Sequence, residues 1–139
     1  MKDLDKYWDN IHLKYVSKYD QWLNEYMHLF NKDGKIIELG CGRAYTSLYL
    51  LENGFSDVTA CDFSKEVINI INNEESGLNT MIFDMTLGLP FEDGKMDVII
   101  AGLCLHYFNN EKTKYIFSEI YRVLKTGGYL IGRVNSANE

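Results

Sequence analysis

The sequence has little proline, little cysteine and no cluster of basic residues. A single proline and 46% hydrophobic residues among 139 argue against a disordered or low-complexity chain and predict one domain, residues 1–139, large enough to bury a core. The 14 basic residues are outnumbered by 20 acidic ones, which gives a formal net charge of −6. Because this charge repels a phosphate backbone, no nucleic-acid partner is expected.

Long apolar runs are also missing. The longest uncharged stretch near the middle of the chain, Val98 to Tyr107, is far shorter than the ~20 residues that cross a bilayer. The first ten residues, MKDLDKYWDN, carry charges where a signal peptide needs an apolar segment. We therefore expect a cytoplasmic protein with no membrane partner.

The three cysteines, Cys41, Cys61 and Cys104, are odd in number and form no C-x-x-C pair. Such spacing fits neither a disulfide framework nor a zinc site, so no metal is expected. All three lie next to apparent strand ends and could meet in space, with His106 close to Cys104. Buried free thiols in a reducing compartment are the simpler interpretation.

The first thirty residues have helical spacing. Apolar side chains recur at positions 4, 7, 8, 11 and 15 and again at 19, 22, 23, 26, 27 and 30, which predicts an N-terminal helical region within residues 1–33. Most of its aromatic side chains are expected to pack on a neighbouring layer. A lid over a ligand, built from Tyr7, Trp8 and Tyr15, is the alternative.

From residue 35 onward, short apolar runs alternate with helical segments. Ser64 and Asn110 are N-cap candidates, and Gly54 is a C-cap candidate. Repetition at intervals of about 22 residues predicts a doubly wound α/β fold, with a parallel sheet and helices on both faces. The predicted strands are 35–39, 57–61, 79–83, 96–101 and 129–134, and the predicted helices are 44–53, 64–74 and 111–125.

Ligands of such sheets bind at the carboxyl ends of the strands, where the stretch KIIELGCGRAYTSLYL, residues 35–50, places a glycine-rich turn. Gly40 and Gly42 leave this turn without side chains, and the next helix points its N-terminal amides at it, so we expect a polar or anionic ligand group there. Asp62, 20 residues after Gly42, is placed to accept hydrogen bonds from a ribose diol. A helix-capping or solvated aspartate is the structural alternative.

A nicotinamide-dependent oxidoreductase would use the same elements. Its fingerprint, G-x-G-x-x-G, needs a third glycine for close packing of helix and strand, and this chain has Tyr45 there. The difference weakens the nicotinamide hypothesis without excluding it.

Four motifs follow one another in an order and spacing typical of one family. They are IIELGCGRA, VTACDFS, FDMTLGLPFEDGKMDVIIAGLCLHYF and EIYRVLKTGGYLIGRV. Over residues 35–134 the chain resembles class I S-adenosylmethionine-dependent methyltransferases, in particular the small methyltransferase-domain subgroup. The resemblance implies a Rossmann-like sheet of strand order 3-2-1-4-5, a cofactor-binding core at residues 35–134, and S-adenosylmethionine as cofactor, with S-adenosylhomocysteine as product.

The resemblance assigns five residues to the amino-acid end of the cofactor. Glu38 would help to orient the ammonium group, and Ala101 would offer its carbonyl to the same group. The backbone of Gly40, Cys41 and Gly42 would line this end of the cofactor.

Four further residues are assigned to the nucleoside end. Asp62 would bind the ribose hydroxyls, and Phe63 would pack on the adenine face. Asp84 would accept from the adenine amino group, while the Met85 amide would reach a ring nitrogen.

Structural roles remain open for some of these positions. Glu38 could pair with Arg43, and Met85 could belong to the core. His106 could act as a general base, although a packed, hydrogen-bonded histidine is the simpler interpretation. No catalytic residue is assigned.

The resemblance also implies direct displacement, in which the protein positions a nucleophile in line with the sulfonium and needs no nucleophile of its own. The expected acceptor is a small molecule, and the alternative is a cofactor-binding module that is inactive alone. Family members continue past the fifth strand, whereas this chain stops at Glu139. We therefore expect a form without the final strands, in which strand 129–134 is an exposed edge open to self-association.

Overall fold

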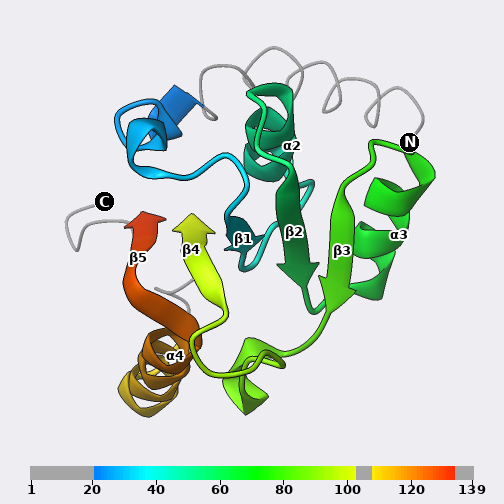
Figure 1. Cartoon of the computed structure of the whole chain (residues 1–139). Coiled ribbons are helices and arrows are strands. Elements are labelled where there is room, and N and C mark those ends of the chain that lie inside the picture. The colour runs from blue at the N-terminus through cyan, green and yellow to red at the C-terminus, as the bar shows by residue number, and fades with distance from the viewer. Residues whose placement is uncertain (1–20, 103–107, 134–139) are drawn as a thin grey trace, which may run out of the picture.

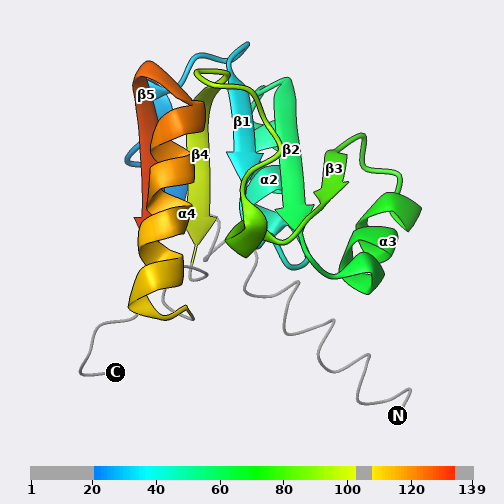
Figure 2. The same ribbon diagram turned by 90° about the horizontal axis from the view of Figure 1, so that it is seen from below.

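The computed structural model describes residues 21–102 and 108–133. Five strands form one sheet in the order β3-β2-β1-β4-β5, and every neighbouring pair is parallel. The arrowheads in Figure 2 accordingly point the same way. The predicted fold class and strand order are confirmed. The strands are β1 (Lys35–Glu38), β2 (Asp57–Asp62), β3 (Asn79–Ile82), β4 (Met96–Gly102) and β5 (Leu124–Arg133).

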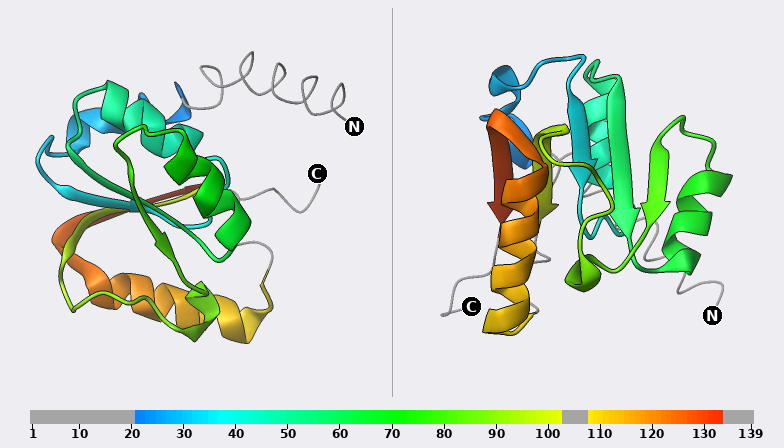
Figure 3. Two further views of the ribbon diagram at one scale, coloured as in Figure 1. Left: turned by 90° about the vertical axis from the view of Figure 1, so that its right-hand side faces the viewer. Right: turned by 60° about the horizontal axis from the view of Figure 1, so that its bottom comes forward.

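Helices lie on both faces of this sheet, as Figure 1 and the edge-on view at the left of Figure 3 show. Helices α2 and α3 cover one face, and α4 covers the other. The α-helices are α2 (Tyr45–Glu52), α3 (Lys65–Asn73) and α4 (Asn110–Val123), and the 3₁₀ turns are η1 (Gln21–Leu23), η2 (Met27–Leu29) and η3 (Met85–Leu87).

The apolar runs of the central strands supply two separate cores, because successive side chains of a strand point to opposite faces. Ile36 is buried on the side of α2 and α3, together with Leu50 and Ile71 from those helices. Ile37 is buried on the side of α4, together with Ile116 of that helix. Burial on both faces explains why the central strands read as continuous apolar runs.

The two predicted N-caps can be compared with the structure. Ser64 caps α3 as predicted, since its hydroxyl accepts from the Val67 amide at 3.3 Å. The third predicted helix starts one residue early, because Asn109 rather than Asn110 is its N-cap and accepts from the Lys112 amide at 2.9 Å.

The prediction for the fifth strand was wrong at its start. Helix α4 ends at Val123, and β5 begins at Leu124, which pairs with Met96, whereas Tyr129 pairs with Val98. The register shift between these pairs accommodates Gly127 at φ +84° and Gly128, where a Cβ would lie 2.9 Å from the Asp97 carbonyl oxygen. The two glycines thus form an irregularity within the strand.

The chain before β1 also differs from the prediction. The helix expected over residues 19–30 is replaced, in its described part, by the turns η1 and η2. Leu23 and Phe30 are buried in the core on the α2 side, and the Trp22 ring lies 4.3 Å from the guanidinium of Arg133. Within residues 21–102 and 108–133, no helix has the length and apolar character needed to span a membrane.

Several sequence predictions concern residues that the structure does not describe. They include the proposed lid and the two candidates near the end of β4. These residues, Tyr7, Trp8, Tyr15, Cys104 and His106, lie outside the described ranges.

Candidate functional site

Backbone hydrogen bonds fix the loop after β1 to its neighbours at the carboxyl edge of the sheet. The Leu39 amide donates to the Ile100 carbonyl at 2.8 Å, and the Cys41 amide donates to the Cys61 carbonyl at 2.9 Å. The loop is therefore held from both sides, by β4 and by β2. This edge is where doubly wound sheets bind ligands.

Three residues of this loop adopt left-handed backbone conformations. Gly40 and Gly42 have φ values of +60° and +54°, which glycine adopts without steric cost. A Cβ at Gly42 would meet nothing within 4 Å, so the backbone is open on that side. Ala44, at φ +61°, takes up the same conformation at a cost of about 1–2 kcal/mol, and its complete burial holds it there.

Glu38 ends β1 as a buried carboxylate, only 6% exposed. Its Oε1 accepts from the backbone amide of Ser47 at 3.2 Å and from the Ser47 hydroxyl at 2.7 Å. The acid thus ties the end of β1 to the first turn of α2. Arg43, the alternative partner for Glu38 in the sequence, forms an ion pair with Glu74 at 3.2 Å.

Asp62 connects the loops that follow β1 and β2. Its Oδ2 accepts from the Gly42 amide at 3.0 Å, and its Oδ1 accepts from the Ser64 amide at 3.0 Å. The carboxylate therefore lies against the glycine loop, and each of its oxygens retains acceptor capacity for a ligand hydroxyl.

The two described cysteines are buried beside these acids. Burial, followed by the nearby carboxylates of Glu38 and Asp62, raises the pKa of Cys61 to about 12 and raises the pKa of Cys41 as well. Both thiols stay protonated near neutral pH, so neither is suited to act as a nucleophile. In the described ranges no group of three or more His, Cys, Asp or Glu side chains is arranged to hold a metal ion.

A pocket of about 260 Å³ opens where the loops after β1, β2 and β3 approach the start of α4. Four of the nine predicted site residues line it: Gly40, Phe63, Asp84 and Met85. The Phe63 side chain is 77% exposed and so available to a ligand. The other lining residues are Phe83, Thr86, Phe108 and Lys112.

The other five predicted residues do not line this pocket. Glu38, Cys41 and Ala101 are buried beneath the edge of the sheet, and Ala101 pairs with Gly132 of β5. Gly42 and Asp62 are joined by their hydrogen bond within the glycine loop.

Sequence analysis missed the remaining four lining residues. Phe83 and Phe108 stand at the two ends of the long quoted motif and could have been found there. Thr86 follows Asp84 at the spacing of a local side-chain cap, which is a weaker signal. Lys112 is a surface residue of α4, and nothing in the sequence connects it to Asp84.

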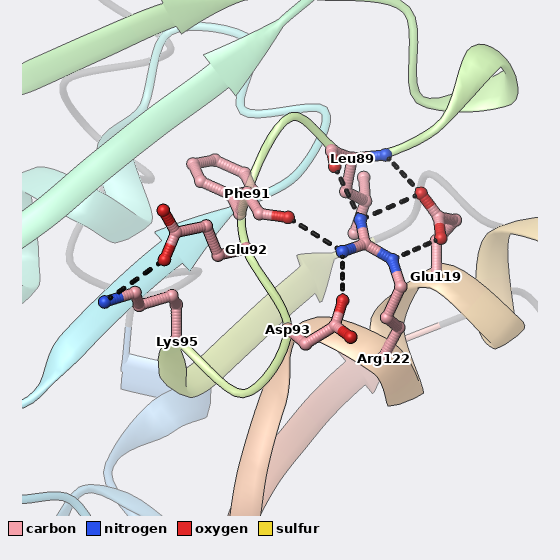
Figure 4. A network of polar contacts seen from close by, with 7 residues as sticks. All are labelled: Leu89, Phe91, Glu92, Asp93, Lys95, Glu119 and Arg122. Atoms are coloured by element: carbon pink, nitrogen blue, oxygen red, sulfur yellow. Dashed lines mark hydrogen bonds and ion pairs between the residues drawn. The ribbon is translucent and has the colours of Figure 1, made fainter.

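Arg122 of α4 secures the segment between η3 and β4 (Figure 4). Its guanidinium donates to the carbonyls of Leu89 at 2.8 Å and Phe91 at 2.9 Å, and to the Asp93 carboxylate at 2.7 Å. Glu119, one turn earlier, accepts from Arg122 at 2.7 Å and from the Leu89 amide at 2.9 Å. These hydrogen bonds hold the pKa of Glu119 below its usual value.

The arrangement suits a ligand with a flat apolar part and positively charged groups. Phe63, Phe83 and Phe108 line the pocket, which gives a ring system surfaces to pack on. Glu38 and Asp62 supply carboxylates beside the glycine loop. A glycine loop after β1, an acid at the end of β2 and an apolar pocket beyond β3 are typical of nucleoside-binding, Rossmann-like α/β proteins.

Comparison with known proteins identifies the family. Residues 37–132 match the model of the methyltransferase domain family, and the chain belongs to that family. The fold is accordingly that of the class I S-adenosylmethionine-dependent methyltransferases, as the sequence motifs predicted.

Two relatives illustrate the similarity. An uncharacterised methyltransferase of Schizosaccharomyces pombe is 28% identical over 116 residues, which are 84% of this chain and 44% of the relative. The tRNA N(3)-methylcytidine methyltransferase Mettl2 of Drosophila melanogaster is 30% identical over 153 aligned positions, covering 94% of this chain and 47% of the relative. The chain thus spans about half the length of these relatives.

Solved structures agree on the fold. A Pyrococcus horikoshii protein superposes with a TM-score of 0.75 at 28% identity, covering 87% of this chain and 57% of that protein. The geranyl diphosphate C-methyltransferase of Streptomyces coelicolor, solved with S-adenosylhomocysteine, gives 0.71 at 20% identity, covering 84% of this chain and 44% of the enzyme. At such identity the second likeness concerns the fold alone.

Proposed function

We propose that this chain binds S-adenosylmethionine at the carboxyl edge of its sheet and transfers the methyl group to a small-molecule acceptor. The pocket lined by Gly40, Phe63, Asp84 and Met85 carries the proposal, because four residues assigned from three separate motifs share one cavity. When bound, the cofactor supplies a methyl group on a positively charged sulfur.

The residues of the chain would divide the work of holding this ligand. Phe63 and the other phenylalanines of the pocket would enclose the base, with Asp84 at its polar edge. Asp62 would bind the ribose hydroxyls while it keeps the glycine loop closed against β2 through Gly42. Glu38 would act from beneath the loop, because its described bonds go to Ser47 and its side chain is buried. The proposed catalytic contribution is positioning and exclusion of water.

The charge of the chain favours a small acceptor over a nucleic acid. A formal net charge of −6 and the absence of a Lys/Arg cluster in the sequence disfavour contact with a phosphate backbone. The similar Drosophila enzyme is named for a tRNA substrate, so a tRNA acceptor is the alternative that must be tested directly.

The cofactor is tested by thermal unfolding. S-adenosylhomocysteine should raise the melting temperature, because a ligand that binds only the folded state stabilises it, and NADH at the same concentration should not. Equal shifts from both, or none from either, would contradict the proposal.

The acceptor is tested with cofactor labelled at the methyl group. Label is expected in a metabolite fraction and not in tRNA. A cofactor-binding module that is inactive alone is the second candidate, favoured by the fact that the chain spans about half the length of its relatives. That candidate predicts binding of S-adenosylhomocysteine without transfer of label to either fraction.

A further inference from the structure

One carboxylate oxygen of Asp84 accepts hydrogen bonds within the turn that follows β3. Its Oδ1 accepts from the backbone amide of Thr86 at 2.9 Å and from the Thr86 hydroxyl at 2.7 Å. Both donors belong to the same residue and reach the same oxygen. Among the described residues, Oδ2 has no hydrogen-bond partner, so a polar group in the pocket can reach it.

The surroundings of Asp84 favour a flat ring with a donor on its edge. Phe63, Phe83 and Phe108 line the pocket, and they come from three different segments of the chain. Thr86 lies in the lining beside Asp84, and Lys112 of α4 completes this side. An apolar ring placed here would present its edge to the carboxylate.

The two hydrogen bonds from Thr86 also determine which kind of group on the ring edge of a ligand Asp84 can bind. They hold the pKa of this carboxyl below its usual value, with a smaller contribution from the positive charge of Lys112. An ionised carboxylate has acceptors and no donor. It therefore binds an exocyclic amino group and repels a carbonyl oxygen at the same position.

We infer that Thr86 is a positioning residue that orients Asp84 toward the ligand and thereby gives the pocket its preference for a 6-amino purine over a 6-oxo purine. The inference rests on the proposed function, since the amino purine is the base of S-adenosylmethionine. It goes beyond that function by naming the residue that acts through Asp84 and the chemical distinction that it enforces.

The test measures two affinities by calorimetry, one for S-adenosylhomocysteine and one for its 6-oxo analogue, S-inosylhomocysteine. The wild-type chain should prefer the amino ligand about tenfold or more, because the oxo ligand leaves the carboxylate facing a carbonyl. Thr86→Val should lower that ratio about three- to tenfold, mainly by weakening the amino ligand. Thr86→Ser keeps the hydroxyl and should restore the wild-type ratio.

Two further variants separate positioning from general damage. Thr80→Val removes a hydroxyl that donates to Asn72 at 2.9 Å, outside the pocket, and should leave the ratio unchanged. Asp84→Asn provides an amide donor beside its oxygen and should move the ratio toward the oxo ligand.

The outcomes are distinct. If Thr86→Val leaves the ratio as in wild type, or weakens both ligands equally, the positioning role is overturned even though the cofactor binds. If the wild-type chain binds neither ligand, the proposed function falls and this inference falls with it. A lowered ratio in Thr86→Val that Thr86→Ser restores supports the role of Thr86.

Discussion

Ser47 donates both its backbone amide and its hydroxyl to a single carboxylate oxygen of Glu38, at 3.2 and 2.7 Å, and both residues are buried. The contact joins the end of β1 to α2 directly below the glycine loop. The sequence places these two residues nine positions apart but does not show that they are in contact.

Ser47→Ala should therefore lower the free energy of unfolding by about 1–3 kcal/mol, because it leaves a buried carboxylate short of a donor. Urea titration measures this loss. Ser118→Ala removes an exposed hydroxyl that donates to the Tyr115 carbonyl at 2.6 Å, and it should change stability by no more than about 0.5 kcal/mol. Equal effects from the two variants would contradict a special role for the buried contact.

Asp62→Ala should weaken binding of S-adenosylhomocysteine by about 1–3 kcal/mol, because ligand hydroxyls and the Gly42 amide both lose their acceptor. Calorimetry measures the change. Asp57→Ala, at the other end of the same strand, removes an exposed ion pair with Lys35 and should leave affinity unchanged. An unaltered affinity in Asp62→Ala would remove this residue from the site.

The raised pKa of Cys61 predicts that the free energy of unfolding falls at alkaline pH. An ordinary thiol titrates near 9.0, whereas the pKa of Cys61 in the folded chain is about 12, so between these values the unfolded state loses a proton that the folded state keeps. The stabilisation is complete below pH 9 and declines as the pH rises toward 12, by up to about 1.4 kcal/mol per pH unit. Denaturation across this range should therefore be less steeply dependent on pH in Cys61→Ala than in wild type. Parallel profiles would contradict the assignment.

Arg122→Met should lower the melting temperature by about 5 °C or more, because one guanidinium holds two carbonyls and two carboxylates of the segment in Figure 4. Lys95→Met, from the same segment, removes only the 3.4 Å ion pair with Glu92 and should change it by about 1 °C or less. Similar shifts in both variants would show that the Arg122 contacts contribute little.

The sequence predicted the sheet because its central strands are buried on both faces and therefore read as apolar runs. The start of β5 was missed because it has no such apolar run. Lys125, Thr126 and the two glycines that follow have no strand character of their own. They belong to β5 as the irregularity between the Met96–Leu124 and Val98–Tyr129 pairs, where Lys125 also forms an ion pair with Asp97 at 3.2 Å. The turns η1 and η2 show that helical spacing in a short segment does not guarantee a regular helix.

The candidate site also contains residues that the sequence could predict and residues that it could not. Gly40, Gly42 and Asp62 could be proposed from spacing because the turn and the adjacent strand end set their positions. Lys112 could not, since its relation to Asp84 depends on how α4 is placed over the loops, and Thr86 offered only the weak signal of a local side-chain cap. Residues that act through tertiary contacts leave little trace in a single sequence.

The pairing of β1 with β4 has a consequence for folding during synthesis. Lys35 of β1 and Asp97 of β4 are linked by a 2.8 Å hydrogen bond although 62 positions separate them. Closing so long a loop has an entropic cost and slows folding. During synthesis β1 leaves the ribosome before β4, so the glycine loop is without the carbonyl of Ile100 until β4 has also been made. A cofactor that needs the closed loop cannot stabilise the nascent chain before that point, and until then the apolar strands already made are exposed to aggregation.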